Sequence, residues 1–378
     1  MDQRVRFIAA LESCRYTMTE LCQEYGISRK TGYKWAERYM QEGVDGLKDR
    51  SRAPLRCPHR TASRCERALV EERRKHPLWG PRKLLVILER RHSDWPWPAP
   101  STAGAILKRH GLVASQRHRW RRRPPAPAKP VIEAARPNDV WTADFKGEFR
   151  MGDRKLCYPL TAADLKSRFL LGCAGKSSVA VDGARPVFKG LFAEYGLPSK
   201  ILTDGGSPFA APHSPRHLTR LSVWWVKLGI EPVVIEPGHP EQNGCHERMH
   251  RTLKAATARP PASCMRSQQR AFDGFRKEFN EERPHESLGM RPPAELYEPS
   301  PRPLPAKTPE MDYPGHYEVR RVRSKGEVKW RGSVLYVSAA LVGERVGFEE
   351  TDEGLWSLCF GPLLLGRYDQ REQSLDLL

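Results

Sequence analysis

The sequence predicts a multidomain chain, with all-α modules in its first third, a mixed α/β core in the middle and a small β-rich domain at the end. Three observations predict this order. Apolar residues recur at helical spacing up to about residue 113, and strand-like and helical runs alternate over residues 138–300. Short runs of alternating polarity, separated by glycines, fill residues 316–378. A chain of 378 residues is long enough for two to four domains.

Residues 1–55 are expected to form a helix-turn-helix domain. Apolar residues at helical spacing predict a helix over residues 4–14, and a second helix over 18–25 ends at Gly26, which suits a C-terminal helix cap. Ser28 is a typical N-cap for a third helix, which would lie in the major groove of DNA. The candidate contacts to base edges are Arg29, Lys30, Thr31 and Lys34. The alternative is an ordinary three-helix bundle with a polar surface.

Residues 60–113 are expected to form a second helix-turn-helix domain. Helices are predicted over 64–76, from Gly80-Pro81 onward, and from Pro100 to Arg109. The residues expected to face DNA are Ser101, Thr102, Lys108 and Arg109. Two such modules would allow the protein to hold a longer DNA sequence than one module can.

The charge of the chain is strongly asymmetric. Residues 1–136 contain 30 Lys and Arg against 14 Asp and Glu, which accounts for most of the net charge of +19. This asymmetry indicates a polyanionic partner, most simply DNA, although a solvated basic face is the alternative. Residues 114–137 are predicted to be a basic, proline-rich linker that lies along phosphates, unless it only improves solubility. Its basic residues are Arg117, Arg119, Arg121, Arg122 and Arg123.

Other features of the sequence argue against a membrane or secreted protein. No run of 18 apolar residues is present, and the first residues begin a polar helix where a secretory signal would be apolar. The nine cysteines show no regular pairing, which favours reduced thiols and a cytoplasmic protein. Cys57, His59 and Cys65 lack a fourth ligand at a credible spacing for zinc.

Residues 138–300 are expected to form a ribonuclease-H-like core. Strands are predicted at about 140–149, 154–163, 168–175, 200–203 and 232–235, with Gly152-Asp153 as the first hairpin turn. Helices are predicted at 180–195, 215–228, 241–257 and 268–282. Three antiparallel strands, extended by further strands with intervening helices, give this plan. After a proline-rich linker over 300–315, five short strands in 316–378 predict a small β-barrel, which could be SH3-like.

Three acidic residues in the core carry the predicted chemistry. Asp144 lies within a strand-like run, Asp204 ends another before Gly205-Gly206, and Glu247 lies on a polar helix. Carboxylates are the ligands that Mg²⁺ prefers, and two metal ions can clamp the attacking and leaving oxygens of a phosphodiester displacement. The three side chains are therefore expected to converge on two divalent ions at one catalytic site.

The core resembles the integrase core of DDE transposases from bacterial insertion sequences, which are relatives of retroviral integrases. The resemblance is carried in order by residues 137–147 around Asp144, by 161–168, by Leu202-Thr203-Asp204-Gly205-Gly206, by 239–254 around Glu247, and by Asn280 with Arg283-Pro284-His285 and Leu288-Gly289. With the two N-terminal modules it covers nearly the whole chain.

The resemblance implies a ribonuclease-H-like fold and two Mg²⁺ or Mn²⁺ ions held by Asp144, Asp204 and Glu247. It implies binding to double-stranded DNA at terminal inverted repeats, cleavage of the donor ends by water, and attack of the freed 3′-hydroxyl on target DNA. It also implies assembly of several copies on paired ends. Two departures from the family pattern are Gly205, where an asparagine is usual, and a longer stretch at 207–220.

Several alternatives remain open at the level of sequence. The chain could be a catalytically inactive DNA-binding protein that represses or inhibits transposition, or, less readily, a ribonuclease H that acts on hybrids. His250 and Lys254 share a helical face with Glu247 and could contact donor-end phosphates. Asp164 could be a fourth metal ligand, but a role in holding the turn near Arg168 is the favoured interpretation.

Overall fold

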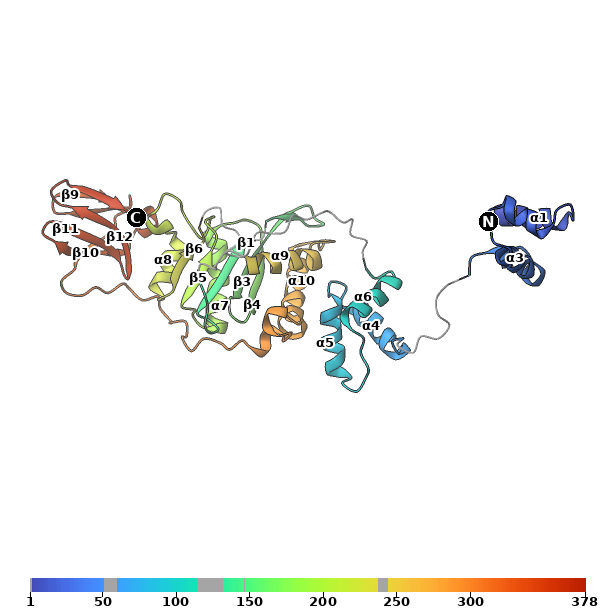
Figure 1. Ribbon diagram of the computed structural model, residues 1–378. Coiled ribbons are helices and arrows are strands. Elements are labelled where there is room, and N and C mark those ends of the chain that lie inside the picture. Colours follow the sequence, from blue (N-terminus) through green and yellow to red (C-terminus); the bar gives the residue numbers. More distant parts are fainter. Residues whose placement is uncertain (1, 51–59, 114–131, 146, 237–243) are drawn as a thin grey trace. The chain divides into compact units, whose positions relative to one another are not determined.

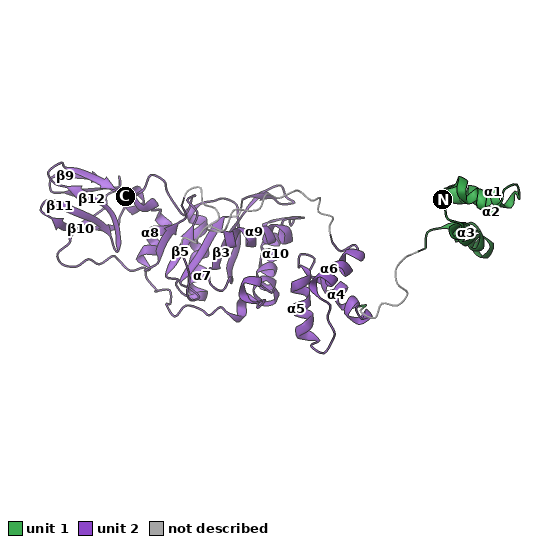
Figure 2. Ribbon diagram, in the orientation of Figure 1, with its two compact units in different colours: residues 1–60 green, residues 61–378 purple. Residues whose placement is uncertain are grey.

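The computed structural model describes residues 2–50, 60–113, 132–145, 147–236 and 244–378. The chain divides into two compact units, Met1–Arg60 and Thr61–Leu378 (Figure 2). The basic linker residues Arg117, Arg119, Arg121, Arg122 and Arg123, predicted to contact DNA, lie outside the described residues. None of the described helices is long and apolar enough to cross a membrane.

The first unit contains the three helices predicted from sequence, α1 (Asp2–Glu12), α2 (Met18–Glu24) and α3 (Arg29–Glu42), followed by a 3₁₀ turn (Gly43–Leu47). Thr17 caps α2 in a capping box with Glu20, and Ser28 caps α3 by accepting a hydrogen bond from the Thr31 N–H. Gly32 lets α2 and α3 approach closely, because a Cβ there would lie 2.9 Å from the Met18 sulfur. The small core is Phe7, Ile8, Leu21, Cys22 and Leu47.

The second unit begins with another helical module, α4 (Ser63–Lys75), α5 (Pro81–Arg91) and α6 (Pro100–Arg109). Its apolar core contains Leu69, Trp79, Leu84, Leu88 and Ile106. Polar contacts attach the module to the region that follows. The His76 ring lies 3.3 Å from a Glu278 oxygen, and Arg90 donates a hydrogen bond to the Met290 carbonyl.

The central region is a six-stranded mixed sheet between two layers of helices (Figure 1). Antiparallel pairing joins β3 to β1, β2 and β4, and parallel pairing joins β1 to β5 and β5 to β6. The strands are β1 (Val140–Phe145), β2 (Phe149–Arg150), β3 (Leu156–Asp164), β4 (Leu170–Lys176), β5 (Lys200–Thr203) and β6 (Glu231–Val234). Along the chain the predicted strands are present, except that the strand expected over 140–149 is divided into β1 and β2.

Helices α7 (Val181–Tyr195) and α8 (Arg220–Lys227) pack with one face of the sheet, where Trp141, Phe188 and Trp225 are fully buried. Helices α9 (Gly244–Thr257) and α10 (Met265–Lys277) pack with the other face through Met249, Leu253 and Phe272. The predicted helix over 268–282 changes from α10 to a π-helix at Glu278–Glu282. The predicted helix over 215–228 is shorter, because a capping box at Thr219 starts α8 only there. Further 3₁₀ turns among the described residues are Pro215–His217, Glu286–Leu288, Pro293–Glu295 and Ala339–Leu341.

The C-terminal region corrects one prediction, because its sheet does not close into a barrel among the described residues. It has seven strands instead of five, in a five-stranded sheet of order β13-β12-β11-β10-β7 and a separate β8–β9 hairpin. The strands are β7 (Glu318–Arg321), β8 (Glu327–Trp330), β9 (Ser333–Tyr336), β10 (Arg345–Asp352), β11 (Leu355–Phe360), β12 (Leu363–Asp369) and β13 (Ser374–Leu377).

The β8–β9 hairpin and α8 cover the apolar face of the C-terminal sheet by side-chain packing. In a barrel, further strand pairing would enclose this face. Trp330 of the hairpin stacks on Phe348 of the sheet at 4.5 Å between ring centroids. Val223 and Val226 of α8 join the same core, and Lys227 pairs with Glu344 at 2.8 Å. A sheet that buries its apolar face under a hairpin and a helix does not need to close on itself. The alternating sequence pattern alone does not distinguish these two solutions.

Candidate active site

Asp144 lies at the carboxyl end of β1, on the face of the sheet that α9 covers. Successive side chains of a strand point to opposite faces. Trp141 and Ala143 are therefore buried in the core with α7 and α8, whereas Thr142 and Asp144 point the other way. The side chain of Asp144 is 20% exposed, so its carboxylate is reachable at the edge of this layer.

Asp204 follows β5, and its position relative to Asp144 is set by strand register. Thr142 pairs with Leu202 and Ala143 with Thr203 in the parallel β1–β5 pair. Asp144 follows Ala143 in the first strand, and Asp204 follows Thr203 at the end of the second. The two aspartates therefore occupy the same level of the sheet at its carboxyl edge. Burial raises the pKa of Asp204 above its usual value, and a hydrogen bond from the Gly206 N–H opposes this shift. A carboxylate with a raised pKa is a candidate for a functional group.

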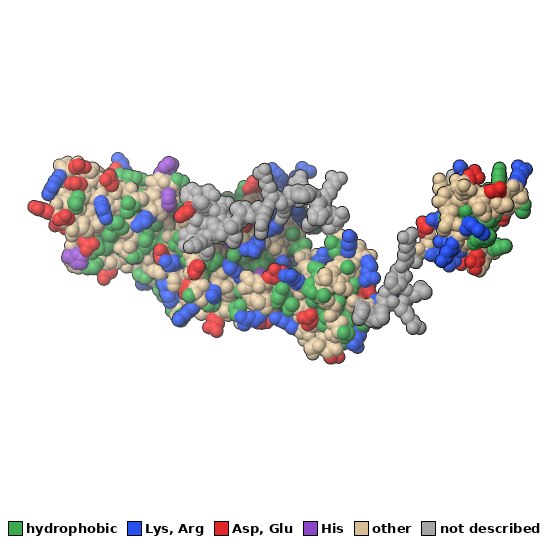
Figure 3. All heavy atoms as spheres, in the orientation of Figure 1, with side chains coloured by type: hydrophobic (Ala, Val, Ile, Leu, Met, Phe, Trp, Pro, Cys, Tyr) green, Lys and Arg blue, Asp and Glu red, His purple; other side chains and the backbone are tan. Residues whose placement is uncertain are grey.

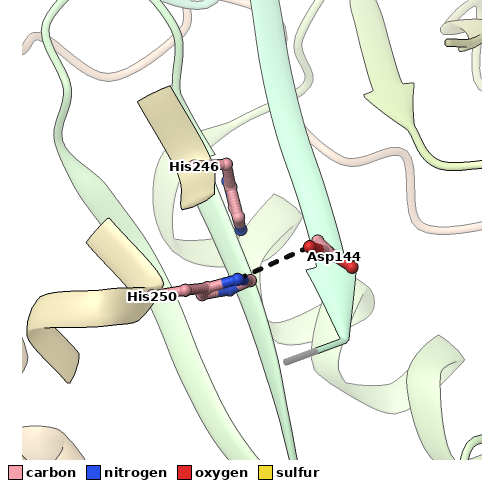
Figure 4. A group of neighbouring side chains, drawn as sticks. All are labelled: Asp144, His246 and His250. Atoms are coloured by element: carbon pink, nitrogen blue, oxygen red, sulfur yellow. Dashed lines mark ion pairs between the residues drawn. The ribbon is translucent and has the colours of Figure 1, made fainter. Parts of the chain in front are cut away.

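Two histidines of α9 complete the group that the structure brings together around Asp144. His246 and His250 lie one helical turn apart and point from α9 toward the end of β1 (Figure 4). Ligand atoms of Asp144, His246 and His250 all lie within 4.8 Å of one another. His250 Nδ1 is 3.5 Å from Asp144 Oδ2, which is an ion pair when the imidazole is protonated (Figure 4).

Buried hydroxyl groups hold these two imidazoles in place. Thr161 Oγ1 lies 2.6 Å from the Nε2 atoms of both His246 and His250, and Thr142 Oγ1 lies 2.8 Å from His246 Nδ1. A hydroxyl has one proton, so at least one of the two imidazoles must donate an Nε2–H to Thr161. Thr161, His246 and His250 are at most 2% exposed. The network therefore links the orientation of α9 to the carboxylate of Asp144.

Glu247 does not belong to this group, and it is exposed on α9. The buried side of the helix carries His246 and His250, and Glu247 lies on its flank. Among the residues that the structure describes, the three predicted carboxylates do not form one cluster within 4.8 Å. The segment before the helix, residues 237–243, lies outside the described part of the chain.

The structure adds His246 to the site and places His250 in the buried network. His250 is 1% exposed and contacts Asp144 and Thr161, and its contact with donor-end phosphates stays a prediction. His246 was absent from the predicted site. The sequence signal that indicates it is the spacing of four residues between the two histidines, which places both on one face of a helix. Lys254, on the same helix, is partly exposed.

Asp164 holds a turn, as the favoured interpretation of the sequence expected. Its Oδ1 accepts a hydrogen bond from the Asn138 N–H, and its Oδ2 accepts from the N–H and hydroxyl of Ser167. The residue is 1% exposed, and burial raises the pKa of its carboxyl group. These bonds fix the start of β1 against the β3–β4 turn, which helps to set the height of Asp144 in the sheet.

Donor chemistry decides which metal ions these residues suit. Carboxylate oxygens, as in Asp144 and Asp204, suit Mg²⁺, and a set that includes imidazole nitrogens suits Mn²⁺, Zn²⁺ or other transition metals. The arrangement has an acidic edge made by two strands and an imidazole pair beside it. It can hold a divalent cation through the acids, while the imidazoles orient Asp144 or share in binding.

The residues predicted to contact DNA from the two helical modules are accessible in most cases. Arg29, Lys30 and Lys34 are exposed at the start of α3, and Thr31 is partly exposed. In α6 the exposed set is Ser101, Thr102, Lys108 and Arg109. On the face seen in Figure 3, Lys and Arg side chains occur on both compact units. Their contact with DNA remains a prediction.

Models of known domain families match successive parts of the chain. The helix-turn-helix domain matches residues 3–54, and the homeodomain-like domain matches residues 31–107. Two integrase core domain models match residues 134–240 and 228–293. The C-terminal domain of the IS481 family transposases matches residues 317–376. The resemblance to insertion-sequence transposases with an integrase core is thereby confirmed.

Individual relatives are more distant. An uncharacterized 39.2 kDa protein of insertion element IS476 from Xanthomonas euvesicatoria is 25% identical over 230 residues, which are 60% of this chain. The chain spans 63% of the length of that protein. Solved structures with some similarity include the magnesium complex of the HTLV-2 integrase catalytic core, at 13% identity and a TM-score of 0.35 over 44% of this chain and all of that chain. A simian T-cell lymphotropic virus intasome chain has 16% identity and a TM-score of 0.38, over 78% of this chain and 97% of that chain.

Proposed function

We propose that this chain, which combines helix-turn-helix domains, an integrase core domain and the C-terminal domain of IS481 family transposases, is a DNA transposase. It binds the terminal inverted repeats of its mobile element, cleaves the donor ends and joins them to target DNA. The observation that supports this most is the register of β1 and β5, because it puts Asp144 and Asp204 at one level of the sheet edge beside α9.

Asp144, Asp204 and Glu247 are the proposed ligands of two Mg²⁺ or Mn²⁺ ions. When bound, such ions neutralise the charge of the scissile phosphate and lower the pKa of a water molecule. The oxygen donors of the two aspartates fit these ions. Glu247 would have to turn toward the strand ends, and no described residue forms an ion pair with it that would resist this movement.

Other residues of the chain orient the Asp144 carboxylate and bind the DNA. His250, fixed by the Thr161 hydroxyl, holds the Asp144 carboxylate in one orientation. Asp164 and Ser167 fix the turn beside β1. The start of α3 and the exposed face of α6 are the proposed surfaces that bind the inverted repeat, and several copies assemble on a pair of ends so that both can be joined.

The test uses the purified full chain with labelled duplexes that carry the inverted repeats flanking its reading frame, in Mg²⁺. Cleaved ends and strand-transfer products are expected, and Asp204→Ala is expected to abolish both while DNA binding persists. Glu148→Gln, which changes an exposed acid near β1, serves as the matched control and should retain activity.

A different outcome would identify the alternative function. If the wild-type chain binds the repeats tightly but yields no cleaved end in Mg²⁺ or Mn²⁺, the chain acts as a DNA-binding repressor or inhibitor of transposition. Cleavage of an RNA–DNA hybrid without any terminal repeat would instead support the ribonuclease H interpretation.

A further inference from the structure

A second feature of the large unit is a pocket of about 410 Å³ on the α9 side of the sheet. Five separate segments line it: the first turn of α5, β1 at Thr142, the end of β3 with the turn after it, α9, and the chain from the π-helix onward. His246 and Thr142, which belong to the network around Asp144, also line this pocket. The pocket therefore adjoins the candidate active site but consists largely of other residues.

Positive charge dominates this pocket. Its cations are Lys83, Arg168, Arg248, Arg251 and Arg283. The acids in its lining are Asp164, whose two oxygens already accept three hydrogen bonds, and the exposed Glu286. Within the described part of the chain, no carboxylate forms an ion pair with any of the five cations. Like charges that outnumber the nearby acids repel one another, so an anion that joins them would be favoured.

Two buried polar atoms at this pocket have no partner. Arg168 Nη1 and His285 Nε2 are inaccessible to solvent and form no hydrogen bond with the described residues. Buried polar groups are nearly always hydrogen-bonded, and each exception requires an explanation. Arg168 also has a positive φ of 64°, an uncommon backbone conformation for a non-glycine residue. The turn thus holds an arginine toward the pocket at some cost in backbone energy.

Nearby positive charge adds to burial in lowering the pKa of two groups that line the pocket. Burial, with Lys83 and Arg283 nearby, lowers the pKa of His285 to about 3. Burial and the charge of Arg283 lower the pKa of Lys83 to about 8. A bound anion would reverse both electrostatic effects.

We propose that this pocket binds a phosphate group, and that the group belongs to a phosphodiester of DNA held beside the active site. Arginine and lysine side chains are the usual ligands of phosphate, and Lys83 lies in the first turn of α5, where the helix dipole also favours an anion. Arg248 and Arg251 are exposed on α9, so a nucleic-acid backbone can reach the pocket from solvent. The assignment to DNA rests on the proposed function, whereas affinity for phosphate itself does not.

The first arm of the test measures binding of inorganic phosphate to the full chain by calorimetry. Wild-type protein is expected to bind it, and Arg283→Gln and Lys83→Gln are expected to weaken binding at least about tenfold, the size of one charge-assisted hydrogen bond. Arg82→Gln is the matched control, because it removes an exposed charge one residue away from Lys83. Arg283→Lys keeps the charge and should restore part of the affinity, and circular dichroism checks that each variant folds.

The second arm measures binding of a 20-base-pair duplex without terminal repeats at several salt concentrations. Loss of one phosphate contact is expected to reduce the slope of log affinity against log salt by about 0.9 in Arg283→Gln. Unchanged DNA binding, with phosphate binding lost, would assign the pocket to a free anion and overturn its role in holding DNA. Equal phosphate affinity in all variants would overturn the anion site itself. Both arms use binding alone, so the result stands even if the chain proves unable to cleave DNA.

Discussion

The acidic sheet edge and the cationic pocket share helix α9 but have opposite charge and opposite construction. Asp144 and Asp204 come from neighbouring strands, and backbone pairing sets their spacing. The pocket draws Lys83, Arg168 and Arg283 from segments far apart in the chain, and side-chain packing alone brings them together. Acids at a sheet edge repel DNA until their charge is compensated, whereas uncompensated cations attract it. The difference indicates a division of labour, in which one region carries the chemistry and the other holds the substrate.

The largest expected effect is a loss of cleavage rate, and a pair of variants can separate it from a loss of DNA binding. Asp144→Asn should lower the rate of end cleavage about a thousandfold, as expected from losing several kcal/mol of stabilisation by a metal ligand, and should not weaken DNA binding. Arg283→Gln should show the reverse pattern, with weaker DNA binding and a nearly normal rate at saturating DNA. Gel assays of cleavage and anisotropy measurements of binding check both. If each variant lost affinity and rate together, the division between the two regions would be wrong.

A smaller effect is expected at the imidazole that touches Asp144. His250→Gln should slow cleavage about tenfold to a hundredfold, the range found when a residue that orients a metal ligand is removed. It should also raise the Mg²⁺ concentration needed for half-maximal rate, which a merely structural change elsewhere in α9 would not do. Rates measured across a Mg²⁺ titration test this.

The exposed His213 provides the matched control, and His213→Gln should match the wild-type chain at every Mg²⁺ concentration. Should His250→Gln reduce the rate without changing its Mg²⁺ dependence, His250 would act on folding alone.

The smallest expected effect concerns stability and pH at the sheet edge. Burial raises the pKa of Asp204 in the folded chain above its unfolded value, so the folded state binds a proton more readily. Stability from this group is therefore present at low pH and is lost as pH rises through the folded pKa. Asp204→Asn should raise the Tm slightly at pH 7. This gain should vanish at a pH below the pKa that Asp204 has in the unfolded chain. Calorimetric melting of both proteins without divalent ions tests it, and a gain that does not depend on pH would contradict the electrostatic explanation.

Much of the fold could be predicted because its signals are local. Thr17 and Ser28 cap helices through hydrogen bonds to N–H groups three residues away, and strand alternation around Asp144 reports which face is buried. The order of secondary structure in the core followed from such patterns. The open C-terminal sheet did not, because strands with the same alternation can bury their apolar face by closing or by taking the β8–β9 hairpin as a cover.

Only part of the candidate site could be predicted from local sequence patterns. Asp144 and Asp204 could be placed as neighbours from sequence, since one lies within a predicted core strand and the other ends an adjacent one. His246 pairs with Thr142 and Thr161, which lie 104 and 85 residues away, and no local pattern encodes such distances. The exposure of Glu247 follows from how α9 rotates when Met249 and Leu253 pack into the core.

Local sequence patterns were sufficient to predict the order of helical, mixed and β-rich regions, the ends of most helices and the two acids of the core strands. These features depend on interactions between residues that are close together in the sequence. Contacts between distant segments account for the other features: two histidines lie beside Asp144, five cations share one pocket, and the last sheet stays open among the described residues. Those outcomes depend on which distant surfaces pack together, and that choice is made by the burial of the whole core.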